Sequence, residues 1–257
     1  MSAGIEPLRE AIRLLTVLPA GSSARPAPPA AAVRWYAPVG VIVGALLAGF
    51  ALLAWELFPP LLAAALVVAG WVAVTGALHL DGLSDTADAA LAPVSRERRL
   101  VIARDVAHGT FAVAAIGVVL LMKVAALGGM GQAECAAAAA FAPVAARAVA
   151  VVAMRIFPPA RPEGMGAATR AGATVPAVAM GLALATVVAA VTLGWAGVAS
   201  AAIAGAFGLA AGAWISGRMG GLTGDGYGAV IELTETAALC AAAAFLGNGH
   251  GSAWVWR

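Results

Sequence analysis

Three aspartates near the end of a long apolar run have the spacing of a shared cation site. Asp81, Asp85 and Asp88 lie in the stretch 76–88, separated by four and three residues. On an α-helix these offsets place all three carboxylates along one face, close enough to share a cation. The motif also contains His79 and the small residue Gly82.

A second acidic group lies near the other end of the chain. It consists of Asp225, within the glycine-rich stretch Gly224–Gly228, followed by Glu232 and Glu235. The whole chain has only 13 acidic residues, so six of them in two clusters beside apolar segments require a chemical reason.

Carboxylate oxygens are hard ligands that suit Mg²⁺, with Mn²⁺ also possible. Protein-bound Mg²⁺ usually keeps several waters and is shared with substrate phosphates, and arginines grip phosphates by bidentate hydrogen bonds. The pattern therefore predicts a phosphotransferase site. The candidate metal ligands are Asp81, Asp85, Asp88, Asp225, Glu232 and Glu235.

Each of these residues also has a simpler interpretation. Carboxylates at a helix end in the interfacial region are often only solvated or capping. His79 is a candidate general base or ligand, and equally a hydrogen-bonded structural histidine. Lys123 and Arg147 lie inside apolar segments, where charge is costly and usually functional. Lys123 is near its segment's end and could instead snorkel to the surface, whereas mid-segment Arg147 is expected to face a polar cavity.

Composition identifies the protein class that must position these groups. The chain of 257 residues is 62% hydrophobic and 11% charged, with a mean hydropathy of +0.94. Soluble domains carry about 25% charged residues, and a β-barrel would show short alternating segments. We therefore expect an all-α, polytopic transmembrane helix bundle that forms one integral membrane domain over residues 1–257.

The apolar runs predict about seven spans, each near the roughly 20 residues needed to cross the hydrocarbon core. The pattern of residues 2–18 predicts an amphipathic helix on the membrane surface, and a loop completes the interfacial segment 1–30. The bundle occupies 31–257. The expected spans are 38–57, 61–80, 109–127, 134–156, 175–193, 198–216 and 229–246.

The charges give this arrangement an orientation. With a cytoplasmic N-terminus, the arginine-bearing loops 81–108, 157–173 and 217–228 fall on the cytoplasmic side, and the intervening turns carry no Arg or Lys. This agrees with the positive-inside rule. Both acidic clusters then face the cytoplasm, so we expect an active site at that face of the membrane.

In these residues the chain resembles the cobalamin synthase family, the adenosylcobinamide-GDP ribazoletransferases. The resemblance runs over nearly the whole chain in the right order. The matching motifs are His79–Asp88, Arg96–Leu100 leading to Arg104-Asp105 and Gly109–Phe111, Arg161–Gly166, and Gly220–Asp225 ending in Gly228-Ala229 with Glu232 and Glu235. The chain departs from the family pattern at Val17, in place of an Arg, and at Val106-Ala107-His108, where His108 could substitute for a basic residue.

The resemblance implies a Mg²⁺-dependent enzyme of the bacterial inner membrane. It would join adenosylcobinamide-GDP to α-ribazole or its 5′-phosphate, forming adenosylcobalamin or its phosphate and releasing GMP. On this hypothesis Asp81, Asp85 and His79 are the candidate catalytic residues. The candidate substrate-binding residues are Arg104, Asp105, Arg147, Arg161, Arg218 and Thr223.

Two other functions fit parts of the pattern. A CDP-alcohol phosphatidyltransferase performs the same type of reaction on a lipid, but its Ala-Arg pair is missing after Asp81-Gly82. A cation-coupled transporter would place its acids near the midplane. The expected partners are the corrinoid nucleotide, α-ribazole and the lipid bilayer, with no nucleic acid. The many small residues also permit a homo-oligomer.

Overall fold

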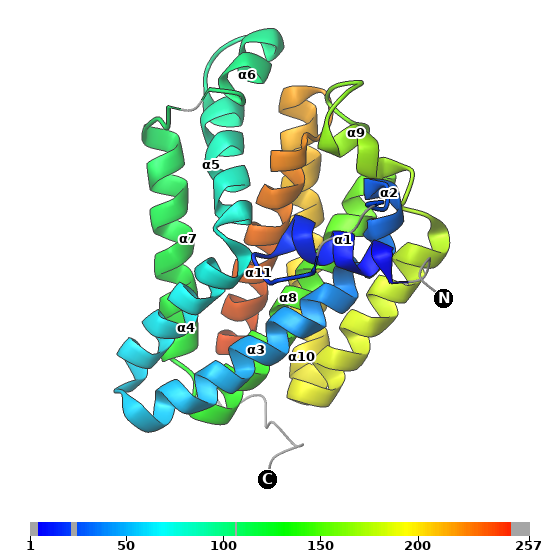
Figure 1. Cartoon of the computed structure of the whole chain (residues 1–257). Helices are drawn as coiled ribbons and strands as arrows, with labels where there is room; N and C mark the ends of the chain where they lie inside the picture. The colour runs from blue at the N-terminus through cyan, green and yellow to red at the C-terminus, as the bar shows by residue number, and fades with distance from the viewer. Residues whose placement is uncertain (1–4, 22–24, 106, 248–257) are drawn as a thin grey trace.

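A computed structural model describes residues 5–21, 25–105 and 107–247. In these ranges the chain is helical, without strands, and the main helices stand side by side in a bundle (Figure 1). The helices are α1 Glu6–Leu15, α2 Pro29–Ala32, η2 Val33–Trp35, α3 Tyr36–Leu57, α4 Pro60–Thr75, α5 Leu78–Leu91, α6 Arg96–Ile102, α7 Thr110–Gly128, α8 Gln132–Ile156, α9 Met165–Arg170, α10 Val175–Met219 and α11 Gly224–Gly247.

Helix α8 is the centre of the bundle. It packs against α3, α10 and α11, and almost all of its alanine-rich length is buried. Small residues let the neighbouring backbones approach closely, as in other membrane bundles. A β carbon on Gly44 of α3, for example, would lie 2.1 Å from the carbonyl oxygen of Ala140.

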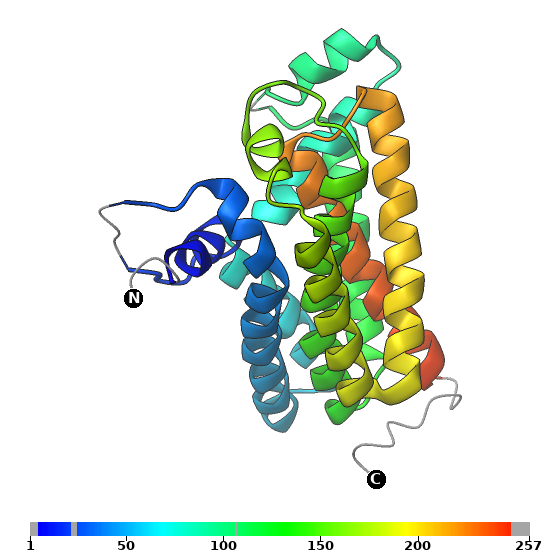
Figure 2. The same cartoon turned by 90° about the vertical axis from the view of Figure 1, so that its right-hand side faces the viewer.

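The amphipathic N-terminal helix is confirmed but is shorter than the predicted 2–18, because α1 ends at Leu15; Ser2 lies outside the described residues. Figure 2 shows that α1 and α2 project from one side of the bundle. The chain after α1 is fixed to the end of α4, since the Val17 amide donates to the Val74 carbonyl oxygen at 2.9 Å.

Five described helical segments are long and apolar enough to span a membrane, or six if the bent pair α4–α5 counts as one span. The membrane class is thus confirmed, whereas the count of about seven is not. Helix α10 has 45 residues, roughly twice the length of one span, and Gly194 inside it has a non-helical backbone. The predicted turn at 194–197 coincides with this break, where the chain reverses (Figure 1).

The predicted span 61–80 is wrong in its last part. Gly76 and Ala77 both adopt left-handed backbone angles, with φ of 60° and 59°, and the chain bends by 89° between α4 and α5. The acidic motif therefore lies on a separate helix. The left-handed conformation suits glycine and strains alanine, so the turn at Gly76 was detectable and the turn at Ala77 was not.

The ends of the bundle differ in charge. In Figure 1 the arginine-bearing helices α6 and α9 and the α10–α11 junction lie at the upper end. The α3–α4 and α7–α8 junctions and the break in the middle of α10 lie at the lower end. The expected grouping of the arginine-bearing loops at one end is thus confirmed.

Candidate active site

Helix α5 presents the first acidic motif as a row. It starts directly after the left-handed turn at Ala77 and runs to Leu91, so Asp81, Asp85 and Asp88 follow one another along one side of two helical turns. Asp81 is exposed, and Asp85 and Asp88 are half-buried.

The start of α11 brings the second motif to this row. Gly224–Gly228, expected to be a loop, forms the first turns of α11, so Asp225 sits in the first turn of a helix. The Thr223 side chain caps this helix, because its hydroxyl oxygen accepts a hydrogen bond from the Gly226 amide at 3.0 Å. Helix α5 packs on this turn, and a β carbon on Gly82 would lie 2.7 Å from the Asp225 carbonyl oxygen.

The structure therefore gathers the carboxylates of Asp81, Asp85 and Asp225. All three lie within range of mutual electrostatic repulsion. His108 borders the group: its Nδ1 atom lies 2.9 Å from the Ser84 hydroxyl oxygen and 3.8 Å from Oδ1 of Asp85. The sequence suggested His108 as a substitute for a basic residue of the family pattern, and this stays a prediction; Val106, two residues before it, lies outside the described residues.

Asp88 has another partner. Its Oδ1 accepts a hydrogen bond from the Ala112 amide at 2.9 Å, and its Oδ2 accepts one from the Gly109 amide. Both donors are at the start of α7. Asp88 thus caps the N-terminus of α7, which is the simpler interpretation that the sequence left open.

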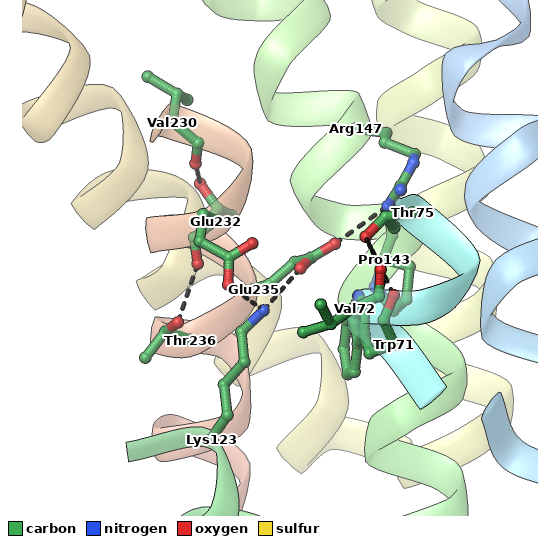
Figure 3. A network of polar contacts seen from close by, with 11 residues as sticks. Trp71, Val72, Thr75, Lys123, Pro143, Arg147, Val230, Glu232, Glu235 and Thr236 are labelled. Carbon is green, nitrogen blue, oxygen red and sulfur yellow. Dashed lines mark hydrogen bonds and ion pairs between the residues drawn. The ribbon is translucent and has the colours of Figure 1, made fainter. Parts of the chain in front are cut away.

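Glu232 and Glu235 lie farther along α11, roughly 10 and 15 Å from Asp225 at 1.5 Å of rise per residue. Figure 3 shows them in a buried ion-pair network. Lys123 Nζ lies 2.5 Å from Oε1 of Glu232 and 2.8 Å from Oε2 of Glu235. Arg147 Nη1 lies 3.0 Å from Oε1 of Glu235. Both glutamates thus have cationic partners of their own.

The two cations of this network are fully enclosed. Lys123 is 2% exposed and Arg147 0%, so the interpretation of Lys123 as a snorkelling residue is wrong. Lys123 Nζ also lies 4.6 Å from the centre of the Trp71 ring. Charges in an apolar bundle are tolerated when they are paired, and here two acids face two bases.

His79 lies between the network and the aspartate group. The side chain is 2% exposed, and Lys123, Arg147 and Glu235 are near enough to act on it electrostatically. Neither ring nitrogen has a hydrogen-bond partner within the described part of the chain. The sequence was compatible with a catalytic histidine or with a hydrogen-bonded structural one. Among the described residues, the His79 ring is buried and has no hydrogen-bond partner.

The arginines at the upper end mostly hold helix ends together. Arg218, predicted to bind substrate, donates from Nε to the Ala90 carbonyl oxygen at 2.9 Å and from Nη2 to that of Ala92 at 3.4 Å. Arg96 donates to the Met219 carbonyl oxygen at 3.0 Å. These bonds join the end of α5 and the start of α6 to the end of α10.

Arg161 and Arg104 stand closer to the aspartates. Arg161 Nη2 donates to the Leu100 carbonyl oxygen at 2.5 Å. Burial and the neighbouring Arg104 guanidinium lower the pKa of Arg161, while the Asp225 carboxylate opposes that shift. Arg104 and Asp105 are exposed and, with Arg161, line an open cavity of about 530 Å³.

Two smaller cavities meet at Asp225. The first, which we call the anion cavity, is about 180 Å³ and includes Arg161, Gly166, Thr223 and Gly224 in its wall. The second, of about 250 Å³, includes His79 and Tyr227. Sequence reasoning assigned no role to Tyr227 or Ser84, although both belong to the motifs that it selected.

Carboxylate oxygens are suitable ligands for Mg²⁺. The carboxylates of Asp81, Asp85 and Asp225 repel one another here. Among the described residues, however, no group of three or more His, Cys, Asp or Glu side chains is placed to hold a metal ion. Mg²⁺ commonly needs only one or two carboxylates, with waters and substrate phosphates supplying the other ligands. The donor set is therefore compatible with Mg²⁺ shared with a phosphorylated substrate.

Comparisons with known proteins give a consistent result. A family model described as cobalamin-5-phosphate synthase matches residues 7–243. An adenosylcobinamide-GDP ribazoletransferase of Stutzerimonas stutzeri is 41% identical over 94% of this chain and 99% of its own length. One of Pseudomonas aeruginosa strain PAO1 is 40% identical over 95% of this chain and all of its own length. No solved structure matches. The chain therefore belongs to the cobalamin-5-phosphate synthase family.

Proposed function

We propose that this protein joins adenosylcobinamide-GDP to α-ribazole or its 5′-phosphate and releases GMP. Its relatives are named adenosylcobinamide-GDP ribazoletransferase. The observation that carries the proposal is the proximity of Asp81 and Asp85 to Asp225. These aspartates come from two motifs about 140 residues apart in the chain, one on α5 and one on α11. This site lies toward the arginine-bearing end of the bundle. We further propose that this end faces the cytoplasm, in keeping with the positive-inside rule.

Asp81, Asp85 and Asp225 are the residues that would hold Mg²⁺. When bound, the ion would neutralise charge on the diphosphate of the donor substrate. Asp88, Glu232 and Glu235 are left out of this smaller set because their carboxylates are engaged by backbone amides or by cations.

The anion cavity is the proposed seat of the diphosphate. The positive end of the α11 dipole and backbone amides at a helix start attract phosphates. Arg161 adds a full positive charge to the same wall, which also contains Glu163 and the proposed metal ligand Asp225. Arg104, next to Arg161, is placed to contact the nucleotide end that leaves as GMP. Arg218 is the less suitable candidate, since its guanidinium holds the end of α5.

The reaction is a displacement at the phosphorus attached to cobinamide. The hydroxyl oxygen of α-ribazole forms a new bond to this phosphorus, the bond from phosphorus to the bridging oxygen breaks, and GMP leaves with that oxygen. Asp85 accepts the hydroxyl proton. His108 lies beside this carboxylate, with its Nδ1 atom 3.8 Å from Oδ1 of Asp85, where it would take the place of the family's basic residue.

The deciding experiment is an incubation of the purified protein in lipid with adenosylcobinamide-GDP and α-ribazole, with and without Mg²⁺. We expect GMP and a cobamide product in equal amounts, and only with the divalent ion. Release of GMP without the cobamide product, or no reaction at all, would overturn the proposal. A lipid phosphotransferase would instead release CMP from a CDP-alcohol substrate.

A further inference from the structure

A largely apolar cavity of about 250 Å³ lies against the aspartate group. Its wall comes from α1, α3, α5, α8, α9 and α11, which close around it from several directions. The apolar part of the wall includes Leu15, Leu78, Met154, Met165 and Ile231. Methionine side chains adapt to flat ring systems and make favourable sulfur–aromatic contacts.

Two polar groups in this wall lack partners. The Tyr227 hydroxyl and both ring nitrogens of His79 have no hydrogen-bond partner in the part of the chain that the structure covers. The two side chains are only 3% and 2% exposed. Buried polar groups nearly always have a partner, and an unmade bond is costly. An apolar cavity with one or two unpaired polar groups is therefore built for a ligand of matching polarity.

The position of the cavity identifies which part of the reaction it serves. Met165, Gly224 and Asp225 line both this cavity and the anion cavity that contains Arg161. A molecule whose apolar end occupied the first cavity would thus have its polar end at Asp225, at the edge of the second. This is the geometry that an acceptor needs when it attacks a bound diphosphate.

We propose that this cavity, the base pocket, binds the heteroaromatic base of the acceptor nucleoside, with the Tyr227 hydroxyl donating a hydrogen bond to its free ring nitrogen. The inference rests on the proposed function, since it concerns the acceptor of that reaction. The base of α-ribazole is a dimethylated benzimidazole, which is flat and apolar and has a single unsubstituted ring nitrogen. Guanine, on the donor, carries several polar edges, and the two unpaired side chains of this wall, His79 and Tyr227, are too few to satisfy them.

Two variants test the assignment by the separate KM values of acceptor and donor. Tyr227→Phe removes the hydroxyl and keeps the ring, and should raise the KM for α-ribazole roughly fivefold to tenfold, the effect of one neutral hydrogen bond. Ile231→Phe adds volume to the wall and should raise it further. The KM for adenosylcobinamide-GDP should stay within twofold of the unmodified protein in both variants.

The matched control is Ile203→Phe. It makes the same change on the outer surface of α10, where Ile203 is 50% exposed, and should change neither KM. Equilibrium binding of free 5,6-dimethylbenzimidazole to the unmodified protein, without donor or metal, provides a readout independent of catalysis and should weaken in Tyr227→Phe. Thermal unfolding checks that both variants remain folded.

The outcomes separate this inference from the proposed function. If the unmodified protein releases no GMP, the proposed function is wrong, whatever the variants do. If it does release GMP, a rise in the donor KM with an unchanged acceptor KM would assign the pocket to the donor and overturn the inference. Unchanged KM values and unchanged benzimidazole binding in folded Tyr227→Phe and Ile231→Phe would also overturn it.

Discussion

Gly82 of α5 packs so closely on Asp225 of α11 that a β carbon at residue 82 would lie 2.7 Å from the Asp225 carbonyl oxygen. This contact is the physical link between two acidic motifs that are distant in the chain. Real β carbons essentially never come so close to backbone, so a larger residue at 82 must push α5 and α11 apart.

The first prediction concerns this contact. Gly82→Ala should lower turnover by up to about 100-fold, because a displacement of about 1 Å in a catalytic group can have that effect. The matched control is Gly117→Ala in α7, where an added β carbon meets nothing within 4 Å. Turnover per folded molecule is the measurement. Equal activity of the two variants would show that the spacing of α5 and α11 does not matter for the reaction.

The second prediction separates two aspartates of the same helix. Asp85→Asn should lower kcat about 100-fold or more, since loss of metal-assisted charge stabilisation costs several kcal/mol. Asp88→Asn keeps an oxygen that can accept from the start of α7 and should retain most of the activity. Parallel assays of both variants, with Glu56→Gln at the opposite end of the bundle as control, check this. Inactivation by Asp88→Asn in a folded protein would return Asp88 to the metal site.

The third prediction concerns the buried ion-pair network. Glu235→Gln leaves Lys123 and Arg147 with one carboxylate instead of two in an apolar setting, and breaking such a pair typically costs about 3–5 kcal/mol. Unfolding in detergent, followed by heat or denaturant, should show a loss of this order. Glu56→Gln should leave the unfolding temperature unchanged. A Glu235→Gln protein as stable as the unmodified one would mean that the network contributes little to folding.

The fourth prediction concerns the turn into α5. Ala77 has a left-handed backbone, with φ of 59°, and this conformation costs a residue other than glycine about 1–2 kcal/mol. Ala77→Gly should therefore leave the protein equally or more stable, because relief of strain offsets the added freedom of the unfolded chain. Ala77→Val should destabilise it. Thermal unfolding of the two variants checks the sign, and a more stable Ala77→Val would contradict the strain.

Local sequence patterns predicted much of the fold. The runs 38–57, 109–127 and 134–156 match α3, α7 and α8 to within two residues at each end, because a span is fixed by its length and apolarity. The turn near Gly194 was also predictable from its composition. The break at Ala77 was not, since alanine is a strong helix former and nothing local demands a left-handed residue there.

The carboxylates of the site were predictable from the sequence, whereas the groups that bond to them were less so. Spacing alone put Asp81, Asp85 and Asp88 on one helical face, but the capping bond from Asp88 to α7 depends on how α5 and α7 pack. Glu232 and Glu235 continue the row that starts at Asp225, yet Lys123 and Arg147 come from two other helices. Tertiary contacts of this kind leave no signal in the spacing of residues along one segment.

The most direct test of the central claim is the Mg²⁺ dependence of GMP release, measured side by side for the unmodified protein, Asp81→Asn and Asp225→Asn in lipid. We predict that the unmodified protein reaches its full rate with Mg²⁺, and that each variant, although folded, loses about 100-fold or more in rate. Near-normal, Mg²⁺-dependent rates in both variants would show that the two acidic motifs do not act together on the diphosphate, and would contradict the account.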